Sequence, residues 1–130
     1  MKKALILIVA IAILSMVFTE SDYKYIQYRD AQMVYNSATV PVETAKKFHL
    51  HWATNGGYDN KSGDVVLLEK SNDGAWVVKT PVFTGAETNP KIVGSFAIMG
   101  AEMKKSVFNN EELELHMADP SFNSLKILKI

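Results

Sequence analysis

An apolar run near the N-terminus constrains this chain more than any other feature. Residues 4–18, ALILIVAIAILSMVF, contain no charge, no Gly and no Pro, and Lys2 and Lys3 precede them. A helix in a soluble core normally carries a polar stripe, whereas the only polar side chain here is that of Ser15. The run therefore predicts a helix that is either a secretory signal peptide or a membrane anchor.

The sequence leaves open whether this leader is cleaved or retained. The run is shorter than the roughly 20 residues of a comfortable membrane span, but no A-x-A-like cleavage site follows it. Tyr23, Tyr25 and Tyr28 lie where an interfacial aromatic belt would lie, and they fit a first strand equally well. We favour an inner-membrane single-pass anchor over residues 1–20, with residues 21–130 as an extracytoplasmic domain. A cleaved leader would make the protein periplasmic or secreted.

Composition excludes several classes of function for the 130-residue chain. It has 14 Lys+Arg and 14 Asp+Glu, so no basic excess indicates a nucleic-acid partner. It has no cysteine, which excludes a disulfide framework, a thiolate metal site and a cysteine nucleophile. It also has no P-loop, no GxGxxG and no G-x-S-x-G motif. We therefore expect no cofactor and no enzymatic activity.

Turn signals divide the exported part into short segments that predict strands. Residues 47–52, KFHLHW, alternate between apolar and polar side chains. Residues 71–74, SNDG, predict a hairpin between two apolar runs, because Asp-Gly suits a turn with positive φ. Two further strands are expected at residues 111–117 and 124–130, and Lys126 and Lys129 would protect the last one if it lies at an edge. Residues 23–45 fit neither the helix nor the strand period.

One segment favours a helix. In residues 88–106, Asn89 is a candidate cap and Pro90 occupies the first helical position. Apolar residues then recur at helical spacing, although Gly94 and Gly100 weaken the pattern and a strand over residues 92–98 is the alternative. The predicted fold class is α+β: the N-terminal apolar helix, then a small, mostly antiparallel sheet with one packed helix.

The histidines are the candidate metal ligands. On a strand, His49 and His51 would share one face, with Phe48, Leu50 and Trp52 facing inward. His116 would face the same way as Glu112 and Glu114 on the strand at 111–117. If these strands were neighbours, imidazoles and carboxylates would gather in a set that suits zinc or copper. The alternative is a solvated face with ordinary cross-strand pairs. Aromatic residues are core candidates, with Trp76 the one expected to be partly exposed.

The order of elements resembles that of type IV pilins and pseudopilins, in which an apolar N-terminal helix runs into a β-rich head. That resemblance implies a structural subunit whose helix packs in a filament. Those proteins carry a processing glycine before the run and a glutamate early within it, whereas here Lys3 and Ala4 precede the run and the first acid is Glu20.

Taken together, these features predict a small membrane-anchored or exported envelope protein. It would act as a non-enzymatic binding module for another envelope protein, with the membrane as its second partner. The alternatives are the pilin-like subunit and a periplasmic metal-binding domain built on His49, His51 and His116.

Overall fold

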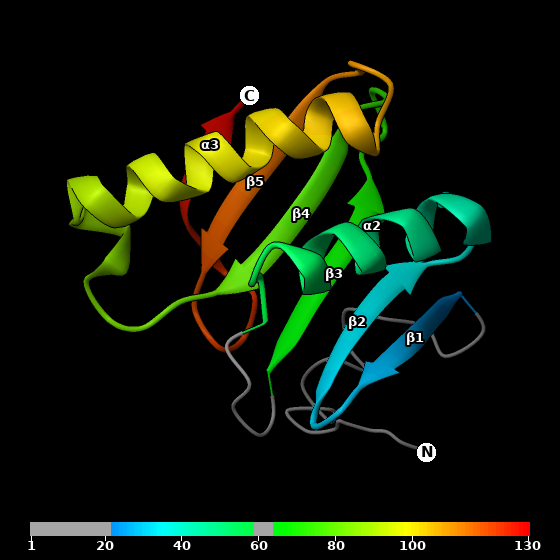
Figure 1. Ribbon diagram of the computed structural model, residues 1–130, viewed down its shortest axis with the longest axis horizontal. Helices are drawn as coiled ribbons and strands as arrows, with labels where there is room; N and C mark the ends of the chain where they lie inside the picture. The colour runs from blue at the N-terminus through cyan, green and yellow to red at the C-terminus, as the bar shows by residue number, and fades with distance from the viewer. Residues whose placement is uncertain (1–21, 59–63) are drawn as a thin grey trace.

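The described part of the chain, residues 22–58 and 64–130 of the computed structural model, forms one six-stranded sheet with two helices. Figure 1 shows both helices lying on the same face of this sheet. The elements are β1 (Tyr23–Tyr28), β2 (Ala31–Asn36), α2 (Val42–Thr54), β3 (Val65–Lys70), β4 (Trp76–Pro81), η1 (Ala86–Thr88), α3 (Pro90–Ser106), β5 (Leu113–Ala118) and β6 (Ser124–Lys129).

The spatial order of the strands is the same as their order in the chain. β1 pairs with β2, β3 with β4, and β5 with β6 in antiparallel fashion, whereas β2–β3 and β4–β5 are parallel. Parallel neighbours need a long crossover, which α2 and α3 supply. The predicted α+β class with a mostly antiparallel sheet is therefore confirmed. The predicted helix within residues 1–20 lies outside the described residues, and no helix within them is long and apolar enough to cross a membrane.

The two crossovers have opposite hands. β3 and β4 are antiparallel, so β4 and β5 run opposite to β2 and β3. Both crossovers step the same way across the sheet, and both helices cover the same face (Figure 1). One of the two must then be left-handed, which is rare because strand twist favours the right-handed connection. The result is a sheet with both helices on one side instead of one on each.

The core lies between the helices and the sheet. It contains Phe48 and Trp52 from α2, Met103 from α3, and alternate residues of the four central strands. Phe108, in the loop after α3, stacks at 4.9 Å from the Trp76 ring and at 6.3 Å from the Phe48 ring. Trp76 is 5 % exposed, so the expectation of a partly exposed Trp76 is wrong. Its ring fills the space beside Phe108, and its indole N–H donates to Glu111 at 2.7 Å.

The predicted helix over residues 88–106 is confirmed as α3. Pro90 begins it, and the Asn89 side chain caps it by accepting from the backbone N–H groups of Lys91 and Ile92. Lys104 and Lys105 lie in the last turn, where positive charge is stabilised by the helix dipole.

The strand predicted at residues 47–52 is wrong, because this segment is the second half of α2. Its buried residues are Ala45, Phe48 and Trp52, at the three- and four-residue spacing of a helix. Leu50, expected to face inward, is 67 % exposed. A segment of six residues is too short for its apolar pattern to distinguish a strand from part of an amphipathic helix. The unassigned residues 23–45 form the β1–β2 hairpin and the start of α2.

Candidate functional site

The three histidines lie in three different environments. His49 and His51 belong to α2, where residues two apart point about 200° away from each other around the helix axis. His116 belongs to β5, on the face of the sheet opposite the helices, as its register with Ile127 and Lys79 shows. The structure therefore does not bring the predicted ligands together. Within residues 22–58 and 64–130, no group of three or more His, Asp or Glu residues is placed to hold a metal ion.

His49 belongs to an aromatic cluster at the end of β1. Its Nδ1 lies 2.7 Å from the hydroxyl of Tyr58, and the Tyr28 ring stacks on Tyr58 at 5.0 Å and meets His49 edge-on at 5.8 Å. Burial lowers the pKa of His49 and raises that of Tyr58. Because the His49 imidazole is neutral and the Tyr58 phenol is protonated, the Tyr58 O–H donates to Nδ1 of His49. This cluster joins β1 to the end of α2 and serves structure.

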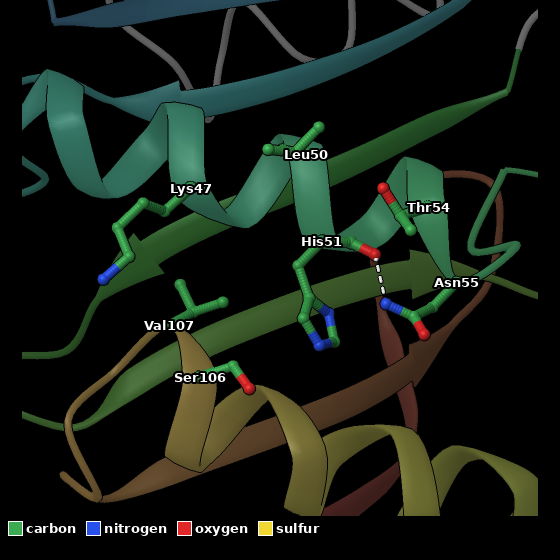
Figure 2. A pocket seen from close by; sticks show the side chains of 7 residues that line it. All are labelled: Lys47, Leu50, His51, Thr54, Asn55, Ser106 and Val107. Carbon is green, nitrogen blue, oxygen red and sulfur yellow. Dashed lines mark hydrogen bonds between the residues drawn. The ribbon is translucent and has the colours of Figure 1, made fainter.

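His51 faces a shallow groove between α2 and the end of α3. Figure 2 shows its ring pointing towards Ser106, with Lys47 and Val107 at one end and Asn55 at the other. The groove has a volume of about 300 Å³ and is open to solvent. The buried Nδ1 of His51 has no hydrogen-bond partner among the described residues.

The face of the sheet opposite α2 and α3 is called the helix-free face, because no helix of the described residues covers it (Figure 1). It carries a continuous row of side chains. One residue from each strand contributes to it, each directly opposite the next. The row comprises Tyr25, Val34, Leu67, Lys79, His116 and Ile127. The centre is closely packed, since Leu67 is only 1 % exposed, while Tyr25 and Ile127 at the two ends are 60 % and 49 % exposed. Within this row, the exposed apolar side chains are therefore those of the two edge strands.

Polar side chains on this face form two networks that fix the strands to one another. Glu69 accepts from the Tyr23 hydroxyl at 3.1 Å and lies 3.8 Å from the Lys79 ammonium group. His116 lies 2.9 Å from Glu114 through Nε2 and 2.7 Å from the Ser124 hydroxyl through Nδ1. In neutral His116, Nε2–H donates to Glu114 and Nδ1 accepts from Ser124.

The serine, imidazole and carboxylate are linked in the same order as in a serine nucleophile site. Ser124, however, begins an edge strand and not a turn at the rim of a cleft. We assign this Ser124–His116–Glu114 group a structural role, because its hydrogen bond from His116 to Ser124 joins β5 to the first residue of β6.

β6 is the most exposed strand of the sheet. Five of its six residues are exposed and the sixth, Leu128, is half-buried. Leu125 and Ile127 are 46 % and 49 % exposed. Because β6 ends the strand order, one side of its backbone has no neighbouring strand in the described chain. This edge and the helix-free face together form the candidate site.

Comparison with known proteins assigns no family. No family model, no curated protein and no solved structure matches this chain. The chemistry of its own residues is therefore what indicates its function.

The sequence indicated only part of this site. The last strand and its two lysines were expected at a possible edge, and the strand order confirms that β6 is an edge strand. The row across the helix-free face was missed, because its residues come from six segments and only the strand register aligns them. The Glu114–His116 pair was expected on one face of a strand, and the alternation of that segment was sufficient to predict it.

Proposed function

We propose that this protein is a small envelope protein, anchored in the inner membrane by residues 1–20 or exported with their removal, and that residues 21–130 bind another envelope protein. The N-terminal Lys-Lys pair and the uncharged apolar run support export. The domain would act by binding and not by catalysis.

The exposed apolar side chains at the two sheet edges are the observation that carries this proposal. Tyr25 on β1, and Leu125 and Ile127 on β6, place apolar surface beside backbone edges that have no partner strand among the described residues. Exposed apolar residues rimmed by polar ones are typical of protein interaction sites. The rigid hydrogen-bonded networks on the same face support it too, because a preorganised surface loses less entropy on binding.

Site-specific photo-crosslinking in membranes of the producing cells tests the proposal. A benzoylphenylalanine placed at Ile127 should yield a discrete crosslinked product. The matched control is Ile98, which is 70 % exposed but lies on α3, on the other side of the molecule. Identical products from both positions, or none from Ile127 and Tyr25, would contradict binding at the sheet edges.

N-terminal sequencing of the membrane-extracted protein tests the anchor. Retention of the residues before Glu20 is expected, and a mature chain that starts at Glu20 or later would leave only the exported form of the proposal.

A further inference from the structure

The backbone of β6 presents hydrogen-bonding groups outward at defined positions. Ile130 N–H donates to the Leu113 carbonyl at 3.0 Å, which makes Leu113 and Ile130 a hydrogen-bonded antiparallel pair. Such pairs alternate with pairs whose backbone groups point away from each other. Ile127, opposite His116, and Lys129, opposite Glu114, are of the second kind. Their N–H and C=O groups therefore point away from β5, along the free edge.

This edge is held in an extended conformation at both ends. At its start, the Ser124 hydroxyl is bonded to His116. At its end, the Lys104 ammonium group donates to the Ile130 carbonyl at 2.9 Å, which ties the strand to α3. The strand is thus ordered before any partner arrives, so an added chain meets a preformed template.

The charged side chains of β6 determine which kind of strand would pair with its free edge. Lys126 and Lys129 are the only charged residues of β6, and both are exposed. They lie three residues apart and therefore point to opposite faces of the sheet. An added strand with carboxylates three residues apart would place one opposite each lysine. An aliphatic side chain between them would lie against Ile127.

The same charges disfavour a second copy of this chain. In the registers that set Lys126 or Lys129 opposite its own copy, an antiparallel β6–β6 contact would bring two lysines together, and like charges across a strand pair are destabilising. The other edge strand, β1, also has a lysine and no acid. Charge complementarity therefore favours an acidic segment of another protein as the added strand.

We infer that the free edge of β6 binds an extended acidic peptide segment, which joins the sheet as a seventh strand. This inference rests on the proposed function and specifies the partner's chemistry: a segment with two carboxylates three residues apart and β-branched aliphatic residues between and beside them. Main-chain hydrogen bonds at Ile127 and Lys129 hold the segment, and the two lysines select it.

A peptide titration with the full-length protein in detergent tests the inference. The probe is a capped, dye-labelled peptide, TETVEVT, and its charge-reversed counterpart is TKTVKVT, with binding followed by fluorescence polarisation. We expect the acidic probe to bind about tenfold more tightly than the basic one. The double variant Lys126→Glu, Lys129→Glu should reverse that preference. Equal binding of both probes by the wild-type protein would overturn the charge complementarity.

A backbone variant separates strand addition from simple charge attraction. Ile127→Pro removes an outward N–H but no hydrogen bond to β5, and proline is tolerated at such edge positions. It should abolish probe binding, while Ile127→Thr, which keeps the N–H, should bind within about threefold of wild type. Far-ultraviolet circular dichroism of both variants checks the fold. Should Ile127→Pro misfold, a probe N-methylated at alternate residues replaces it, and undiminished binding of that probe would overturn strand addition.

The crosslinking experiment distinguishes this inference from the proposed function. If benzoylphenylalanine at Tyr25 captures a partner and the yield is unchanged by Ile127→Pro, the binding function stands and the β6 site is wrong. If the yield falls with Ile127→Pro and not with Ile127→Thr, both are supported.

Discussion

Because residues 47–52 are helical, Phe48 and Leu50 contribute very differently to the free energy of unfolding. Phe48 is completely buried against Trp52 and Phe108, so Phe48→Ala should lower the free energy of unfolding by about 3–5 kcal/mol. Leu50 is 67 % exposed, so only about a third of its side chain contributes burial. Since full burial of leucine contributes about 1.5–3 kcal/mol, Leu50→Ala should cost less than about 1 kcal/mol. On a strand, both residues would face the core and both would cost several kcal/mol.

Urea unfolding of the full-length protein, followed by tryptophan fluorescence, measures both variants. With a slope of about 1–1.5 kcal/mol per molar, Phe48→Ala should lower the unfolding midpoint by about 2–5 M, and Leu50→Ala by less than about 1 M. Lys47→Ala, exposed on the same helix, is a control for helix propensity alone. A loss of 2 kcal/mol or more for Leu50→Ala (an order-of-magnitude threshold) would refute the helical assignment and restore the strand.

Three other outcomes are expected. Gly94→Ala should stabilise the protein by about 0.5–1 kcal/mol, because nothing lies within 4 Å of the added Cβ. Gly57→Ala should destabilise it by about 1–3 kcal/mol, because that Cβ would lie 2.3 Å from Trp52. Thermal unfolding measures both variants, and a gain in stability for Gly57→Ala would contradict the packing of Trp52 against Gly57. The pKa of His49 is lowered by burial, so the unfolded chain binds the proton more tightly, and stability should fall as pH drops through the unfolded value of 6.5. His49→Gln should remove this part of the pH dependence of stability. An unchanged pH profile in that variant would exclude His49 as its source. Zinc calorimetry should give the same isotherm for the wild-type protein and for a variant with all three histidines changed to alanine, and a site seen only in the wild type would restore the metal hypothesis.

Local signals were sufficient to predict some elements and not others. Asn89 and Pro90 fix the start of α3 by capping chemistry that acts within three residues, so the sequence alone revealed it. The Ser71–Gly74 turn likewise predicted the β3–β4 hairpin, in which Ser71 accepts from Gly74 and Ala75. α2 lacks such a signal, since Pro41 at its N-cap makes no side-chain cap, and the two-residue alternation inside it hid the helical spacing.

The candidate site could not be predicted from single segments, because it depends on how different strands and helices are placed relative to one another. Whether three histidines meet is decided by strand register and helix rotation, which a single segment does not encode. His116 shows the contrast: its pairing with Glu114 follows from a two-residue spacing on one strand, whereas its bond to Ser124 depends on how β6 aligns with β5. The exposed edge was predictable in character from Lys126 and Lys129, but its position at the end of the sheet was not.

The sequential strand order has a consequence for the way the sheet assembles while the chain is being synthesised. Each described strand pairs with the one synthesised just before it, so the sheet can grow in the order in which its segments are synthesised. No late segment has to insert between two strands already paired, which spares the emerging chain a slow rearrangement. β6 is the last of the described strands to be synthesised, and its outer edge has no neighbouring strand among the described residues.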